Sequence, residues 1–206
     1  WVGTMAGEGV KGFYRGEDQT VYVPGRGSVE DAPPPDEIRL TPIRSDAKRV
    51  LWQNGEAVLL DAGDQVALYE FRSKSNTLGE TVVGGLIEVI NLVEQGDYRG
   101  LVIGNEGKHF SVGANLKEMV ELAGQYDRIE GLVLRFQEMV QKVHYAGKPV
   151  VVATHGRVLG GGCEMTMACT HPVADAESYI GLVELAVGLI PAGCGTMRLA
   201  AFAHER

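Results

Sequence analysis

The residue of this sequence best placed for chemistry is Glu164, which follows a run of three glycines at positions 160–162. An apolar run at 150–153 predicts a buried strand before the glycines, and a helical pattern starts directly after them at Cys163. The first amides of a helix have no intrahelical partner and lie at the positive end of the helix dipole. The junction therefore suits an oxygen that is gaining negative charge, with a carboxyl group beside it. The same pattern also fits a tight corner followed by a surface glutamate.

A second stretch, at positions 100–119, has the same design. Apolar residues at 101–103 predict a buried strand, a polar glycine-rich loop follows, and a helix is expected from about Leu116. The loop ends in the run Ser111-Val112-Gly113-Ala114-Asn115, so a second helix N-terminus offers free amides. A third stretch, at 179–199, carries Glu184 as an isolated acid in an apolar run. A carboxylate there is costly to bury unless it has a partner or a function.

Several other kinds of site do not fit the sequence. The glycine run lacks the third glycine of a dinucleotide fingerprint, and no phosphate-binding GxxxxGK[ST] motif occurs. Ser111 is not enclosed in a G-x-S-x-G motif, and no histidine has a convincing nucleophile as partner, so a serine hydrolase is not expected. The three cysteines follow neither a zinc pattern nor a disulfide framework, so we expect no metal site and a reducing, cytoplasmic setting.

Together the three stretches resemble the crotonase (enoyl-CoA hydratase/isomerase) superfamily. The pieces F-S-V-G-A, L-G-G-G-C-E and V-E-L-A-V-G-L-I-P-A-G-C-G occur in the family's order over roughly positions 56–206. The resemblance implies an α/β fold built as a ββα spiral, and an acyl-CoA thioester as substrate. It also implies that the backbone amides of Ala114 and Gly161 hold the thioester oxygen, that Glu164 activates water and that Glu184 protonates C2 of the acyl chain. Gly161 is expected to adopt an unusual backbone angle.

The resemblance also suggests residues that contact CoA or the acyl chain. Lys74 and Ser75 lie in a polar loop that contacts CoA in the family, although a solvated turn fits them as well. Val112 and Gly160 flank the two amides. Met119, with Val120 and Leu122, fits either an acyl tunnel or the plain core, and the core is the preferred interpretation.

A second resemblance lies at the N-terminus. The run GEGVKGFYR at 7–15 is similar to the end of the C-terminal domain of 3-hydroxyacyl-CoA dehydrogenases. We therefore expect a fragment of a bifunctional dehydrogenase–hydratase, with the end of the dehydrogenase at 1–23, a proline-rich linker at 24–46 and a C-terminally incomplete crotonase-like core at 47–206. NAD is expected only for the dehydrogenase part, and the hydratase part needs no cofactor.

Composition limits the choice of partners. The chain of 206 residues has a formal net charge of −8, which argues against nucleic acid as a general partner. No run of eighteen apolar residues occurs, so we expect no membrane span. A homo-oligomer is expected. Periodicity predicts strands at 57–60 and 66–71, and helices at 46–53, 79–95 and 128–145, after an extended N-terminal tail with strand-like pieces at 12–14 and 20–23.

The expected reaction is hydration of trans-2-enoyl-CoA to 3-hydroxyacyl-CoA in β-oxidation. The alternatives are a non-catalytic acyl-CoA-binding scaffold domain and an enoyl-CoA isomerase. The sequence departs from the common family pattern at Asn115, Val183 and Cys194, and we expect the Cys194 side chain to add bulk near the reacting water.

Overall fold

The computed structural model describes residues 7, 14–15, 20–23, 25–30 and 38–204, and the chain divides into two compact units, 1–39 and 40–206. In the described part of the first unit, β1 (Tyr14–Arg15), β2 (Thr20–Val23) and β3 (Gly27–Glu30) form an antiparallel sheet in that order. The strand predicted at 20–23 is confirmed as β2. Most of the GEGVKGFYR run lies outside the described residues.

The second unit is built on a mixed sheet, which has six strands among the described residues, in the order β10-β8-β7-β6-β5-β4. The strands β4 (Val50–Gln53), β5 (Ala57–Gly63) and β6 (Val66–Phe71) pair antiparallel with one another in that order. From β6 onward, β7 (Gly100–Gly104), β8 (Val150–Thr154) and β10 (His171–Ala174) pair in parallel. The short strands β9 (Arg157–Leu159) and β11 (Tyr179–Gly181) form a separate parallel pair. The chain is therefore α/β, as predicted.

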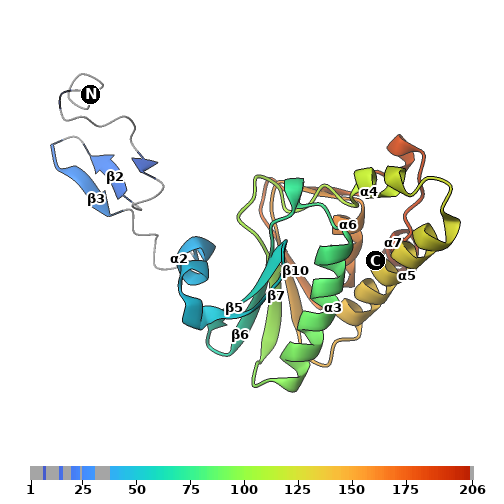
Figure 1. The fold of residues 1–206 in the computed structure, drawn as a ribbon, viewed down its shortest axis with the longest axis horizontal. Helices are drawn as coiled ribbons and strands as arrows, with labels where there is room; N and C mark the ends of the chain where they lie inside the picture. The colour runs from blue at the N-terminus through green and yellow to red at the C-terminus, as the bar shows by residue number, and fades with distance from the viewer. Residues whose placement is uncertain (1–6, 8–13, 16–19, 24, 31–37, 205–206) are drawn as a thin grey trace. The chain divides into compact units, whose positions relative to one another are not determined.

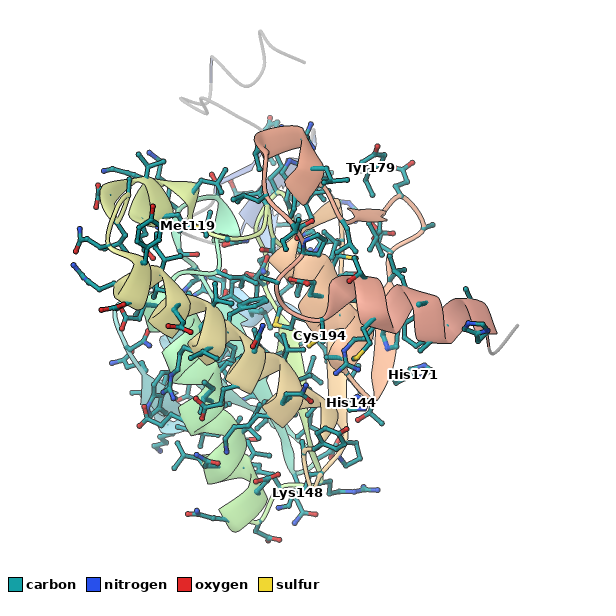
Figure 2. All side chains as sticks on the ribbon, turned by 90° about the vertical axis from the view of Figure 1, so that its right-hand side faces the viewer. Met119, His144, Lys148, His171, Tyr179 and Cys194 are labelled. Atoms are coloured by element: carbon teal, nitrogen blue, oxygen red, sulfur yellow. The ribbon has the colours of Figure 1, made fainter. Side chains whose placement is uncertain are left out.

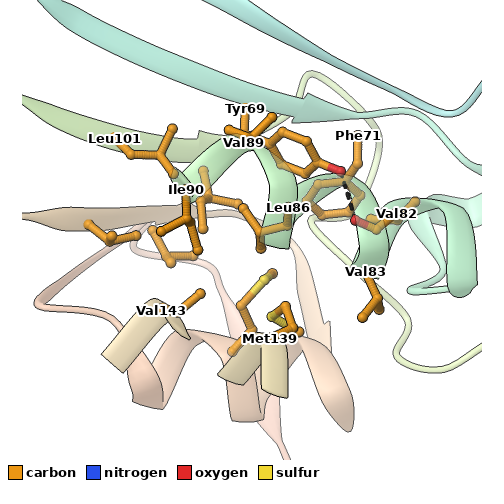
Figure 3. Close-up of a cluster of buried hydrophobic side chains, with 14 of the residues drawn as sticks. Tyr69, Phe71, Val82, Val83, Leu86, Val89, Ile90, Leu101, Met139 and Val143 are labelled. Carbon is orange, nitrogen blue, oxygen red and sulfur yellow. Dashed lines mark hydrogen bonds between the residues drawn. The ribbon is translucent and has the colours of Figure 1, made fainter. Parts of the chain in front are cut away.

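Helices cover both faces of the main sheet (Figure 1). The long helices α3 (Glu80–Gln95) and α5 (Tyr126–His144) confirm the two predicted helices and pack on one face. The core between the sheet, α3 and α5 includes Tyr69, Leu86, Ile90, Leu101 and Met139 (Figure 3). The Tyr69 hydroxyl donates to the Val82 carbonyl at 2.8 Å, and burial raises the pKa of this phenol. Alternate residues of β5 and β6 face the opposite side, as the two-residue period of a strand requires.

The structure of the segment before β5 differs from two predictions. The linker expected at 24–46 was predicted to be extended, which holds for β3 within it, but its last part forms the helix α2 (Leu40–Ser45). Leu40 and Ile43 are buried against β5 and β6, and this apolar contact stabilises a helix too short to be stable alone. The helix expected at 46–53 is also wrong. The chain there forms a 3₁₀ turn (Ala47–Arg49) and then β4, because pairing with β5 outweighs the weak helical pattern.

The remaining elements are short. They are the 3₁₀ turn Lys74–Asn76, α4 (Leu116–Glu121), α6 (Gly161–Ala168), the 3₁₀ turn Glu184–Val187 and α7 (Gly195–His204). Three of them, α4, α6 and the turn that begins at Glu184, contribute residues to the cavity described below. The helix expected from Leu116 is confirmed, and the helix expected from Cys163 begins slightly earlier, at Gly161. Within the described residues, no helix has both the length and the apolar character to cross a bilayer.

Candidate active site

A cavity of about 240 Å³ lies between the loop that follows β7, the start of α6, α5 and the segment before α7. Apolar side chains such as Leu78, Phe136 and Ile190 form most of its wall. Seven of the residues singled out from the sequence line it, namely Val112, Ala114, Met119, Gly160, Gly161, Glu164 and Glu184. The wall thus brings together residues that are more than a hundred positions apart in the sequence. A mostly apolar cavity of this kind is typical of a small-molecule site.

The two glycine-rich loops touch each other at this cavity. A Cβ atom on Gly113 would lie 2.9 Å from the Leu159 carbonyl oxygen and 3.6 Å from the Gly161 amide nitrogen. Gly113 also has a φ of +94°, a conformation that favours glycine. The unusual angle expected at Gly161 lies instead at Gly160, whose φ is +54°. Gly161 already belongs to the first turn of α6, so the residue with positive φ is one position earlier than expected.

The amides of Ala114 and Gly161 have no acceptor among the described residues. The carbonyl of Gly113 accepts a hydrogen bond from the Leu78 amide at 2.9 Å, and the carbonyl of Gly160 accepts from the Glu164 amide at 3.0 Å. Because a trans peptide unit is planar, its N–H points away from its C=O. These two bonds therefore fix the directions of the Ala114 and Gly161 amides and leave their protons free to bind a ligand oxygen.

Glu164 is buried in the first turn of α6, with 2% of its surface exposed. Its Oε1 accepts hydrogen bonds from the amides of Gly193 and Gly195, each at 2.8 Å. Burial raises the pKa of the Glu164 carboxyl and the nearby Glu184 charge raises it further, while the two amides act in the opposite direction. The carboxyl group is thus held firmly in one orientation and takes up a proton more readily than an exposed glutamate.

Glu184 begins the 3₁₀ turn that passes over the glycine run. Its Oε2 is buried without a hydrogen-bond partner among the described residues. Its Oε1 lies 3.1 Å from the position a Cβ atom would occupy on Gly160, so a larger residue there would crowd the carboxyl group. A buried carboxylate oxygen without a partner is costly, and such a group is typical of a functional site.

The amides of Gly193 and Gly195 are hydrogen-bond partners of Glu164 that could not be named from the sequence. The signal was the pair of glycines around Cys194, directly before a helical pattern. A Cβ atom on Gly193 would lie 2.6 Å from Glu164 Oε2, and one on Gly195 would lie 2.8 Å from Glu164 Oε1. Only glycine lets the backbone approach the carboxyl group this closely.

Cys194 was predicted to add bulk near the reacting water, but its side chain does not reach the cavity. Its thiol lies 3.9 Å from the Gln141 amide nitrogen on α5. Figure 2 shows Cys194 beside the start of α7, apart from Met119. The backbone of Cys194 has a φ of +72°, a left-handed conformation that typically costs about 1–2 kcal/mol for a residue other than glycine.

Three further predicted residues take different positions. Lys74 and Ser75 lie in an exposed turn outside the cavity, where Ser75 has a φ of +57°. Met119 lines the cavity, and no residue of α4 is buried, so the preference for a core position at Met119 and Val120 is wrong. Among the described residues, no group of three or more His, Cys, Asp and Glu side chains could hold a metal ion.

A sequence model described as enoyl-CoA hydratase/isomerase matches residues 62–203. The chain belongs to the enoyl-CoA hydratase/isomerase family. It is 40% identical over 203 residues to a probable 3-hydroxyacyl-CoA dehydrogenase of Bacillus subtilis, covering 97% of this chain and 25% of that protein. It is 36% identical over 126 residues to a probable enoyl-CoA hydratase of the same organism, covering 61% of this chain and 48% of the relative.

Solved structures share the fold of this chain. Pseudomonas aeruginosa DspI is 27% identical with a TM-score of 0.67, over 72% of this chain and 61% of that one. An enoyl-CoA hydratase from Bacillus anthracis is 25% identical with a TM-score of 0.65, over 71% of this chain and 57% of that one. The predicted crotonase-like fold is confirmed. The chain spans a quarter of the first of the two Bacillus subtilis relatives and about half of the second.

Proposed function

We propose that this chain carries the site for hydration of trans-2-enoyl-CoA to 3-hydroxyacyl-CoA, a step of β-oxidation. The observation that carries the proposal is the meeting of two carboxyl groups, Glu164 and Glu184, with two free amides in one apolar cavity. The names of the relatives, a probable enoyl-CoA hydratase and a probable 3-hydroxyacyl-CoA dehydrogenase, support a place in fatty-acid oxidation.

The two amides would stabilise negative charge on the substrate. Addition of water at C3 of an unsaturated thioester moves electrons onto the thioester oxygen. The amides of Ala114 and Gly161 would donate hydrogen bonds to that oxygen, and their fixed directions mean that little reorganisation is needed. Loss of one such donor typically lowers the rate by about 10²–10³.

The two carboxyl groups would move the protons. Glu164, ionised, would accept a proton from the attacking water, and its raised pKa brings it closer to the pH at which a general base works best. Glu184 would donate a proton to C2 and complete the addition. The two bonds to Glu164 Oε1 leave Oε2 without a described donor, so this oxygen would face the water.

Several partners follow from this proposal. Lys74 and Ser75 would contact the CoA part of the substrate from their exposed turn, and Val112, Met119 and Gly160 would contact the thioester or acyl chain. Hydration does not change the oxidation state, so NAD would serve only an associated dehydrogenase. The three free thiols, Cys163, Cys169 and Cys194, support a reducing setting such as the cytoplasm.

The test is turnover of crotonyl-CoA by the full-length protein and its variants Glu164→Gln and Glu184→Gln. Each variant should lower kcat by at least about 10²-fold, because each removes a proton-transfer group. The Kd for a saturated acyl-CoA should change far less, since neither side chain is needed for binding. Near-normal turnover by either variant would contradict the role given to that residue.

Analysis of the same reaction separates the remaining candidates. A scaffold domain would bind the thioester without turnover, and an isomerase would move the double bond without adding water. The presence of two carboxyl groups in one cavity favours hydration over both, since a scaffold needs neither and isomerisation can proceed with one.

A further inference from the structure

Ser111 is a completely buried residue for which the proposed reaction has no role. Its Oγ donates a hydrogen bond to the Asn76 carbonyl at 2.8 Å and accepts one from the Gly113 amide at 3.1 Å. The hydroxyl proton is therefore already committed, and a lone pair is occupied. The group is held as a structural link between two loops.

The backbone of Ser111 makes a second link, to the strand that leads into the glycine run. Its amide donates to the Arg157 carbonyl at 3.1 Å, and its carbonyl accepts from the Leu159 amide at 3.0 Å. Ser111 also packs closely on the start of α6, since a Cβ atom on Gly162 would lie 2.8 Å from Ser111 Cβ. One residue thus contacts the loop that carries Ala114 and the segment that carries Gly161.

The hydroxyl acts on the Ala114 amide from two directions. It accepts a hydrogen bond directly from the Gly113 amide. It also donates to the carbonyl of Asn76, and Leu78, two residues further on, donates its amide to the Gly113 carbonyl. The peptide unit between Gly113 and Ala114 is planar, so these contacts together determine where the Ala114 proton points.

We infer that Ser111 is a positioning residue that aligns the Ala114 amide with the Gly161 amide, so that both can bind one oxygen. The inference rests on the proposed function. Removal of the hydroxyl would leave the Gly113 amide and the Asn76 carbonyl buried without this partner, and the loop would shift to find others. The Ala114 proton would then no longer point at the position of the thioester oxygen.

The test measures the alignment without catalysis. Butanoyl-CoA labelled with ¹³C at the thioester carbonyl is bound to the full-length protein, and its carbonyl stretch is measured by isotope-edited infrared spectroscopy. Two aligned donors polarise the carbonyl and move the band below its position in free butanoyl-CoA. In Ser111→Ala the band should return most of the way to its position in free butanoyl-CoA. The kcat for crotonyl-CoA should fall at least about tenfold, with KM nearly unchanged. This is less than the loss expected for deletion of a donor, because a misaligned donor still stabilises part of the charge.

Three variants serve as controls. Thr154→Val removes another buried hydroxyl, one that has no partner among the described residues, and should keep both the band and kcat. Ile103→Val removes a methylene group from a fully buried side chain of β7 and should lower thermal stability without moving the band. Ser111→Cys keeps a weak donor and should give a smaller change in the same direction, so it carries the test if the alanine variant does not fold.

The outcomes separate the two proposals. The role of Ser111 is overturned if the band is shifted equally in the unsubstituted protein and in Ser111→Ala, and if kcat of the variant is normal. The proposed function would then still stand. A change in Thr154→Val or Ile103→Val as large as in Ser111→Ala also overturns that role, since loss of stability alone would then explain it. An unshifted band in the unsubstituted protein overturns the proposed function, and the role of Ser111 with it.

Discussion

Glu164 is a carboxyl group that the fold keeps almost entirely out of contact with water. Burial favours its neutral form, whereas the amides of Gly193 and Gly195 favour the ionised form, and the net effect is a raised pKa. In the unfolded chain the same group titrates near its ordinary value of about 4.3. The folded protein therefore binds this proton more tightly, and its ionisation at higher pH opposes folding.

This linkage predicts that Glu164→Gln raises the thermal stability of the protein at neutral pH. A glutamine Oε1 can still accept from both glycine amides but carries no charge. Below the ordinary carboxyl pKa both side chains are neutral, so the difference in Tm should be small there and should grow as the pH rises through the raised pKa. Thermal unfolding between about pH 4 and pH 8 gives the comparison. A difference in Tm that is constant across this range would contradict the burial argument.

At the scale of single elements, α2 is joined to the sheet by an ion pair with a buried carboxylate as well as by its apolar contact. Arg44 on α2 donates to both carboxylate oxygens of Glu70, at 2.5 and 2.7 Å, and Glu70 lies on β6 with 1% of its surface exposed. Arg72 approaches the same carboxylate at 3.9 Å. The carboxylate of Glu106 accepts from the Leu40 amide and the Thr41 hydroxyl, which satisfies donors at the start of α2.

The substitution Arg44→Leu should destabilise the protein by about 2–4 kcal/mol, somewhat less than complete loss of a buried partner because Arg72 remains. The double variant Arg44→Leu/Glu70→Leu should recover most of that loss, since it leaves no buried charge. Urea unfolding measures both. The control is Arg135→Ala, which breaks the exposed pair with Glu138 and should cost less than about 1 kcal/mol. Equal losses in the single and double variants would show that the buried charge is not the cause.

At the scale of the whole molecule, exposed apolar side chains concentrate in the last part of the described chain. Leu185 is 80% exposed, Ile190 75% and Met197 58%. Figure 2 shows Tyr179 at the periphery of the molecule. A monomeric protein rarely exposes so many large apolar groups within so short a stretch. The distribution supports the expected homo-oligomer.

We therefore expect the protein to self-associate in solution through this stretch. The double variant Leu185→Lys/Met197→Lys should lower the average mass in sedimentation equilibrium by at least about half, because charges placed in an apolar contact oppose its formation. Neither residue lines the cavity. Val120→Lys, at an equally exposed apolar position on α4, is the matched control and should leave the mass unchanged. A protein that is monomeric at all concentrations before substitution would contradict the expectation.

Much of this architecture could be predicted from the sequence because its signals are local. The periods of the long helices α3 and α5, the apolar runs of β5 to β8 and the two glycine-rich helix starts all depend on neighbouring residues. The grouping of Glu164, Glu184, Ala114 and Gly161 came from resemblance to a family, and the structure brings these residues to one cavity. Their chemical roles stay predictions.

The parts that escaped prediction depend on distant contacts. The helix α2 forms because β5 and β6 offer it an apolar surface, and 24–46 contains no helical period that would reveal this. The side chain of Cys194 points to α5 because the backbone of Cys194 is left-handed. A cysteine in the sequence does not indicate such a backbone conformation. The hydrogen bonds from Gly193 and Gly195 to Glu164 join residues about thirty positions apart.

Those two hydrogen bonds have a consequence for measurement. The amide of Gly193 lies in a loop and that of Gly195 in the first turn of α7, where backbone protons without an intrahelical partner normally exchange quickly with solvent, yet both are buried against one carboxylate oxygen. Their exchange with deuterium should therefore be slow whenever Glu164 is seated and fast whenever the loop opens. Two backbone protons can thus report how often the Glu164 carboxyl group is in place, in the resting protein and without any ligand.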